Sequence, residues 1–284
     1  MKKILSILAV SFFMIGMIAC DKIEEDNYFK PNNESNDTIP LPIEDINNWK
    51  NEKVVLLEDF TGVRCVNCPD AAIVAHELQE QYGHQLVVLG VHAGWNANPM
   101  KDTTYIDFRT EEGEEWNKFF NFMSNPIGTI NRQSEGSSYG YAFGTWSDEV
   151  KKAIVGTPNI RLLSATKYNE KDRELKVTVY SKFLEDFTDK YNLTVCLMED
   201  HIVGKQAGKN GGDEYDHRHV FRKTLNGAWG TELNEETILA DTEIIKNYSI
   251  KLDDNFNADN CYIIAYVYLR ESKEVLQVIE KKIK

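Results

Sequence analysis

The alternation of apolar and polar residues divides the chain into two halves with different periodicities. In the first half, short apolar runs at 53–57 and 86–91 are typical of buried strands. Between them, apolar residues recur every four positions, which predicts an amphipathic helix over 69–82. A strand, a helix and a second strand joined by short connections indicate a right-handed βαβ unit with parallel strands.

Two further helices are expected at 111–123 and 145–155, separated by a turn and a strand that begin near Pro126. The apolar face of the first consists of Trp116, Phe119, Phe120 and Met123. These side chains follow the i, i+3, i+4, i+7 spacing of a buried helix face, so we interpret them as core residues rather than as a ligand site.

From Pro158 onward the pattern changes to period-two runs separated by polar turns, which is typical of strands with one buried and one wet face. Seven such runs are found, at 159–168, 174–183, 192–198, 217–225, 243–252, 261–269 and 274–282. Seven short strands at this spacing suggest an immunoglobulin-like antiparallel sandwich. The pattern therefore predicts an α/β domain over 51–157 and an all-β domain over 158–284.

The first twenty residues have the features of an export signal. Lys2 and Lys3 give a positive start, and the apolar stretch that follows is too short to span a bilayer. It ends at Ala19 and Cys20, a small residue before a cysteine, which resembles the lipoprotein box of bacteria. We expect residues 1–19 to be a signal peptide and Cys20 to carry a lipid anchor after cleavage.

Residues 20–50 are expected to form a flexible acidic tether. Aspartate and glutamate outnumber lysine in this segment, and three of the seven prolines lie in it. Such a stretch buries too little apolar surface to order itself. It would hold the folded part away from the membrane.

Composition narrows the classes of function. The 284 residues are 42% hydrophobic, which is enough for one large domain or two ordinary ones with their own cores. The formal net charge of −13 argues against binding to phosphate backbones, so no nucleic acid partner is expected. No cofactor is expected either, because the glycine-rich stretch 208–212 lacks the spacing of a phosphate-binding loop and a following helix.

Four cysteines remain besides Cys20, and export to an oxidising compartment would allow them to form disulfides. Cys196 and Cys261 both fall in predicted strands of the second half and are candidates for a structural disulfide. A bridge between them would close a long loop and add about 4 kcal/mol in the loop-entropy model. Buried free thiols are the alternative, because cysteine also packs well as a small apolar residue.

The other two cysteines form a Cys-x-x-Cys motif at Cys65 and Cys68, between a predicted strand and a helix that Pro69 helps to start. The free N–H groups and the dipole at the helix start, together with Arg64, favour a thiolate. We therefore expect Cys65 to be the more acidic and more exposed thiol, and Cys68 to resolve a mixed disulfide.

Two other interpretations of the cysteine pair remain open. A zinc site needs two more ligands, but no second Cys-x-x-Cys exists, and His217 and His219 are expected on the solvent face of a strand. The other interpretation is a permanent structural disulfide. It would close so small a ring that the loop-entropy model predicts little stabilisation.

The surroundings of the pair resemble those of the thioredoxin family. Asp59 lies six residues before Cys65, and Pro126 falls after the next helix and before a strand. In that family these positions hold a buried acid, which exchanges a proton with the second cysteine, and a cis-proline beside the disulfide. The resemblance implies a thioredoxin-like domain over 51–157 with Cys65, Cys68, Asp59 and Pro126 as catalytic residues.

A narrower resemblance covers nearly the whole chain after the signal segment. The stretches 58–69, 91–94, 128–132 and 219–227 are similar to those of the outer-membrane-protein-twenty-eight-related lipoproteins. These pair a thioredoxin-like domain with a β-rich domain. The resemblance implies a lipid-anchored outer membrane lipoprotein of the bacterial cell envelope, on its periplasmic or its surface face.

Two functions therefore remain to be distinguished. The first is thiol–disulfide exchange through Cys65 and Cys68, with protein thiols or disulfides as partners. The second is a non-catalytic surface binding protein or adhesin, in which the disulfide is structural and the β-rich half contacts a surface ligand that the sequence does not identify.

Overall fold

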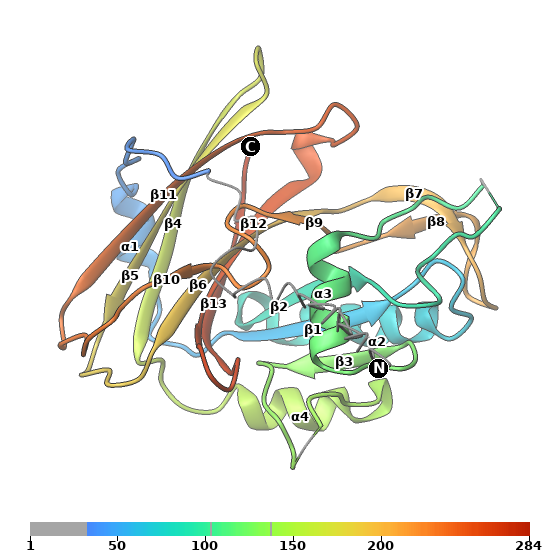
Figure 1. Cartoon of the computed structure of the whole chain (residues 1–284), viewed down its shortest axis with the longest axis horizontal. Helices are drawn as coiled ribbons and strands as arrows, with labels where there is room; N and C mark the ends of the chain where they lie inside the picture. The colour runs from blue at the N-terminus through green and yellow to red at the C-terminus, as the bar shows by residue number, and fades with distance from the viewer. Residues whose placement is uncertain (1–32, 103, 137) are drawn as a thin grey trace, which may run out of the picture. The chain divides into compact units, whose positions relative to one another are not determined.

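The computed structural model describes residues 33–102, 104–136 and 138–284 (Figure 1). The predicted signal peptide, residues 1–19, and the predicted lipid site Cys20 lie outside these residues. The described part is a mixed α/β structure in which strands outweigh helices. None of its helices is long and apolar enough to cross a membrane.

Most of the strands belong to one large sheet of the order β13–β12–β6–β9–β2–β1–β3, with β10 paired to β6 off this path. Its strands are β1 Val55–Thr61, β2 Leu86–His92, β3 Ile127–Ile130, β6 Tyr191–Glu199, β9 Val220–Thr224, β10 Thr231–Glu232, β12 Cys261–Leu269 and β13 Val275–Lys282. The large sheet crosses the boundary predicted at 157/158. The strands of the two halves meet where Gly90 of β2 pairs in parallel with Val220 of β9.

The βαβ unit expected at the start of the fold is present. β1 and β2 pair in parallel, and α2 (Cys68–Tyr82) connects them across one face of the sheet. β3 pairs antiparallel with β1, and α4 (Trp146–Ala153) packs on the same face as α2. β1 runs four residues beyond the apolar stretch 53–57, because Glu58 and Asp59 are buried polar residues that interrupt the pattern.

The helix α3 (Glu111–Phe119) is shorter than the sequence predicts. Trp116 and Phe120 are buried, as expected from the spacing. The helix ends at Phe119, and Asn121 adopts a positive φ of 55°. Met123 is therefore 87% exposed and does not share the buried face.

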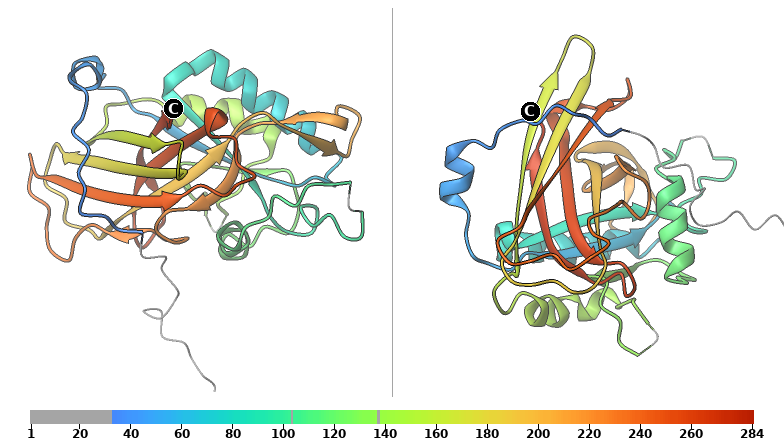
Figure 2. Two further views of the ribbon diagram at one scale, coloured as in Figure 1. Left: turned by 90° about the horizontal axis from the view of Figure 1, so that it is seen from above. Right: turned by 60° about the vertical axis from the view of Figure 1, so that its left-hand side comes forward.

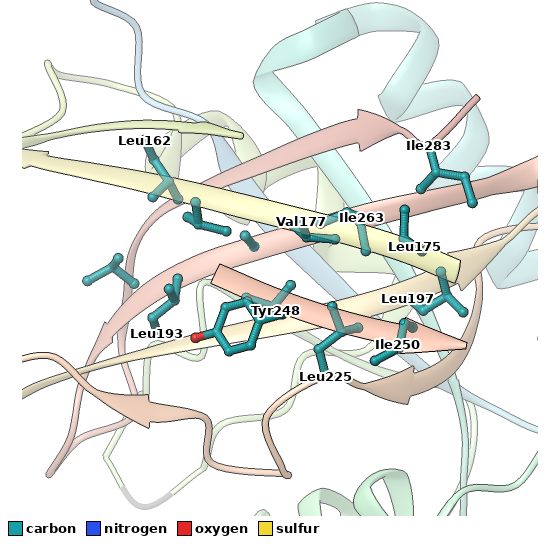
Figure 3. Packing of buried hydrophobic residues seen from close by; sticks show 14 of the residues in the cluster. Leu162, Leu175, Val177, Leu193, Leu197, Leu225, Tyr248, Ile250, Ile263 and Ile283 are labelled. Atoms are coloured by element: carbon teal, nitrogen blue, oxygen red, sulfur yellow. The ribbon is translucent and has the colours of Figure 1, made fainter. Parts of the chain in front are cut away.

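A second sheet of three strands, β11–β5–β4, packs on the C-terminal part of the large sheet. Its strands are β4 Ile160–Asn169, β5 Glu174–Phe183 and β11 Glu243–Lys251. Figure 3 shows the core between the two layers, where Leu175 and Val177 of β5 face Leu197 and Ile263 of the large sheet. All seven predicted strands of the second half are present, with bounds that differ by a few residues.

The side chains of β6 and β12 alternate between two cores, and this alternation separates the two strand cysteines. Cys196 faces the core that α3 covers. Cys261 faces the opposite core, between the large sheet and the second sheet. In register, Cys261 pairs with Glu199 and Cys196 with Ile264. The prediction of a Cys196–Cys261 disulfide is therefore wrong. Both are buried free thiols, which was the alternative.

The flexible tether predicted over 20–50 is wrong for its described part, residues 33–50. Asn33 and Ser35 exchange backbone hydrogen bonds with β11. The Ile39 carbonyl accepts a hydrogen bond of 2.6 Å from the Tyr180 hydroxyl, and α1 (Ile43–Asn48) follows. Figure 2 shows this segment, in blue, running beside the second sheet. The sheet supplies partners that the polar composition alone does not reveal.

A buried ion pair of the first half is hydrogen-bonded to the second half. Arg132, which follows β3, donates to both carboxylate oxygens of Glu58 in β1, at 2.6 and 2.8 Å, and to the Tyr266 hydroxyl of β12 at 2.8 Å. Neither charged side chain is exposed. The guanidinium carbon lies 4.9 Å from the Trp116 ring centroid and 5.0 Å from that of Tyr266, so aromatic faces surround the charge.

A hairpin that the sequence pattern does not reveal consists of β7 (Ile202–Gln206) and β8 (Gly212–His217). It forms a two-stranded sheet of its own. The glycine-rich stretch 207–211 is its tip, and Figure 1 shows the hairpin at the end of the structure where β1 terminates. The predicted strand 217–225 begins too early, because His217 ends β8 and β9 starts at Val220.

Candidate functional site

The candidate site is the loop between β1 and α2. Cys65 and Cys68 form a disulfide with a Cα–Cα distance of 5.4 Å, and Cys68 is the first residue of α2. Pro69 occupies the first turn of the helix, where the missing N–H costs no hydrogen bond. The strand, the loop and the helix are therefore placed as the sequence predicts.

The expected difference in exposure between the two cysteines is not found. Cys65 is 3% exposed and Cys68 is 2% exposed, so the prediction that Cys65 is the accessible thiol is wrong. The reason is the tip of the β7–β8 hairpin, which comes from the second half of the chain and lies against the loop.

The hairpin tip is held to the loop by specific contacts. The Gln206 amide donates to the carbonyls of Gly62, at 3.1 Å, and of Cys65, at 3.0 Å. The Ala207 N–H donates to the Val63 carbonyl at 2.9 Å. A side chain at Gly208 would overlap the Val66 carbonyl oxygen, so only glycine allows this close approach.

A pocket of about 630 Å³ opens beside the disulfide, between α2 and the β7–β8 hairpin, and we call it the α2 pocket. Its apolar wall includes residues of α2 and β2, and its polar wall is formed by β8 and the turn after it. Cys68 and Asp59 both line this pocket, and Cys65 does not. The pocket therefore reaches the disulfide from the side of the second cysteine.

Asp59 is 5% exposed, and its Oδ1 has no hydrogen-bond partner in the described part of the chain. Burial penalises the charged carboxylate and raises the pKa of Asp59 to about 7. A carboxyl group with this pKa exchanges protons near neutrality, which is the range in which a thiol must lose or gain one.

Four histidines line the α2 pocket, and three of them are buried: His92, His217 and His219. Burial lowers the pKa of His217 to about 4. The pKa of His92 lies well below its usual value, chiefly because of burial and to a lesser extent because of repulsion from His217. Burial also lowers the pKa of His219. These rings are therefore neutral at pH 7, and the expectation that His217 and His219 lie on a solvent face is wrong.

Pro126 follows a cis peptide bond after Asn125. It directly precedes β3, whose Ile127 pairs with Phe60 at the end of β1. Pro126 thus lies at the end of the sheet from which the cysteine loop departs. It is not among the residues that line the α2 pocket.

The described residues contain no group of three or more His, Cys, Asp or Glu side chains that could hold a metal ion. Sequence reasoning missed Gln206, His92 and the burial of His217 and His219. The glycine-rich stretch 207–212 marks the tip of the hairpin that carries Gln206 and His217, but the periodicity identifies this stretch only as a turn.

The fold and this site define a β-rich α/β protein with a buried disulfide at a helix start. The chain matches the family described as Outer membrane protein Omp28 over residues 114–284, and it belongs to this family. Membership places the protein in the bacterial cell envelope. The matched residues begin after β2 and do not include the cysteine pair.

A comparison with curated proteins finds no match. Among solved structures, HBP35 of Porphyromonas gingivalis is similar with a TM-score of 0.62 and 18% identity, covering 82% of this chain and 76% of that chain. This likeness concerns the fold alone. A domain of the outer membrane lipoprotein Omp28 from Porphyromonas gingivalis is 28% identical over 46% of this chain and 92% of that chain, with a TM-score of 0.31.

Proposed function

We propose that the protein is an envelope-anchored thiol–disulfide exchange protein whose redox centre is the Cys65–Cys68 pair. The observation that supports this proposal best is the position of Asp59. Its carboxyl group has a pKa of about 7 and lines the same pocket as Cys68. Its buried Oδ1 has no hydrogen-bond partner among the described residues. A carboxyl group so placed is suited to accept and return the proton of a thiol.

The arrangement of the elements around the pair supports a thioredoxin-like unit over 51–157. A parallel β1–α2–β2 unit carries the cysteines, and a cis-proline leads into the antiparallel β3. Residues 158–284 would then be the immunoglobulin-like sandwich, with its two layers on either side of a common core. Cleavage after residue 19 and lipid attachment at Cys20 would anchor the folded part to the membrane.

A second function is favoured by the burial of the disulfide. Because the hairpin tip covers the cysteine loop, the disulfide could be a permanent part of a scaffold. The protein would then act as a non-catalytic surface binding protein or adhesin, and the β-rich half would contact the ligand.

A redox titration separates these functions. The full chain with Cys20→Ser is equilibrated in glutathione buffers, and the reduced fraction of Cys65 and Cys68 is measured by alkylation and mass spectrometry. Exchange predicts a midpoint between about −270 and −120 mV, the range of known exchange proteins, whereas a structural disulfide lies below about −300 mV. The Cys196→Ala variant is the control and should leave the midpoint unchanged, because its thiol lies in a different core.

A further inference from the structure

The two sides of the disulfide differ in accessibility. On the side of Cys65, the hairpin tip is hydrogen-bonded to the loop through Gln206 and Ala207. On the side of Cys68, the α2 pocket leads to the cysteine and to Asp59. Cys68 lines this pocket and Cys65 does not, so a partner that enters the pocket approaches the disulfide from the Cys68 side.

The size of the α2 pocket limits the kind of partner that can use it. Its volume of about 630 Å³ lies within the range of about 300–1,000 Å³ that small-molecule sites have. A folded protein partner would have to contact the cysteine loop. The hairpin tip already covers this loop, because Gly208 lies directly against Val66.

The chemistry of the α2 pocket fits a small zwitterion. Asp59 and His217 line the pocket, and their buried atoms Asp59 Oδ1 and His217 Nε2 have no hydrogen-bond partner among the described residues, so their hydrogen-bonding capacity is unused. At its edge lie the carboxylate of Glu214 and the ion pair of Arg218 with Asp216, at 2.9 Å. Charges of both signs complement an ammonium group and a carboxylate on one molecule.

We propose that the redox partner of the Cys65–Cys68 disulfide is a low-molecular-weight amino-acid thiol, which enters the α2 pocket and exchanges at the Cys68 sulfur. This inference rests on the proposed exchange function and names its substrate class. It also reverses the order of the cysteines expected from the sequence, since the mixed disulfide forms on Cys68 rather than on Cys65.

The exchange consists of two displacements. The partner thiol gives its proton to the Asp59 carboxylate, and its sulfur bonds to Cys68 Sγ while the Cys65–Cys68 bond breaks. The electron pair of that bond goes to Cys65 Sγ, which then takes up a proton. A second partner thiol attacks the first in the mixed disulfide and releases the Cys68 thiol. Two partner thiols are thereby oxidised to one disulfide, and the protein disulfide is reduced to two thiols.

The order of the cysteines is tested with two single-thiol variants of the full chain, both carrying Cys20→Ser. The Cys65→Ser variant leaves Cys68 as the reactive thiol, and the Cys68→Ser variant leaves Cys65. Each is mixed with oxidised glutathione, and mass spectrometry follows formation of the mixed disulfide. We expect Cys68 to react about tenfold faster, because only Cys68 lines the pocket through which a small molecule approaches.

The route through the α2 pocket is tested in the Cys65→Ser background. Ala72→Trp places an indole in the pocket, and Ile73→Trp does so from a position at its rim that needs no core space. Both should slow the reaction about tenfold, because the indole occupies volume that the probe must enter. Glu77→Trp, at an exposed position of α2 outside the pocket, is the matched control and should have no effect.

The outcomes separate the inference from the function on which it rests. If the wild-type disulfide is reduced in glutathione buffers but Cys65 reacts faster than Cys68, the substrate route is wrong and the exchange function stands. The same conclusion follows if neither tryptophan variant slows the reaction. If the wild-type disulfide is not reduced within the buffer range, the exchange function itself fails.

Discussion

Asp59→Asn should stabilise the protein at neutral pH and above, although it removes a proposed catalytic group. The pKa of Asp59 is about 7 in the folded protein and 3.8 in a solvated chain, and burial is the cause. Between these values the folded state binds more protons than the unfolded state, so stability falls as the pH rises. The loss is complete above the folded pKa.

The magnitude follows from the size of the shift. Three pH units at 1.36 kcal/mol each correspond to about 4 kcal/mol of stability lost above pH 7. Asparagine has no charge to bury, but its unpaired amide costs about 1–2 kcal/mol. The variant should therefore be more stable than the wild type by about 2–3 kcal/mol at pH 8. Below about pH 4, where Asp59 is protonated in both states, the variant should be less stable than the wild type.

Urea unfolding of both proteins, followed by tryptophan fluorescence from about pH 4 to about pH 8, measures this difference. Other titrating groups, including the buried histidines, are common to the two proteins and cancel in the comparison. The reasoning requires the difference to change sign as the pH falls. A difference that stays constant across the range would show that Asp59 keeps an ordinary pKa, and the basis for its role as a proton acceptor would be lost.

Three further predictions concern the core, the hairpin and the strand cysteines. Arg132→Met should destabilise the fold by about 3–5 kcal/mol in urea unfolding, because Glu58 is left buried without its partner, and adding Glu58→Gln should recover part of the loss. Gly208→Ala should speed reduction of the disulfide by a reduced thiol protein, because a methyl group there pushes the tip off the Val66 carbonyl. Gly212→Ala is its control: its φ is also positive, but its methyl group would meet open space, so an equal effect of the two would show that the tip does not protect the disulfide by covering the cysteine loop. Thiol counting in denaturant without reductant should find two thiols in a Cys20→Ser chain, whereas a bridge between the strand cysteines would give none.

The local elements could be predicted from the sequence because their signals are local. α2 has a four-residue apolar period, a proline in its first turn and Gly83 at its end, and its bounds differ from the predicted 69–82 by one residue. The strands of the second half alternate over long runs, and β5 has the predicted bounds. The cis peptide before Pro126 is also present where the family resemblance implies it.

The contacts between distant segments could not be predicted in this way. β7 is only five residues long and β8 is mostly polar, so they lack the alternation that identifies a strand. Gln206 at the end of β7 is buried because it is hydrogen-bonded to the cysteine loop, which lies more than a hundred residues earlier in the chain. For the same reason, no local pattern indicates that the hairpin covers Cys65 or that His217 lines a pocket. The pairing of residues 33–35 with β11 is likewise tertiary and leaves no periodic signal.

The sheet that both halves share constrains the order of assembly. β2 ends at His92, but its neighbour β9 begins only at Val220, so during export the N-terminal strands are delivered long before the strand that closes their edge. An open strand edge is a site for pairing with other chains. Folding of the first half is thus expected to wait for the last third of the polypeptide, and truncated chains that lack it should aggregate rather than fold as a separate unit.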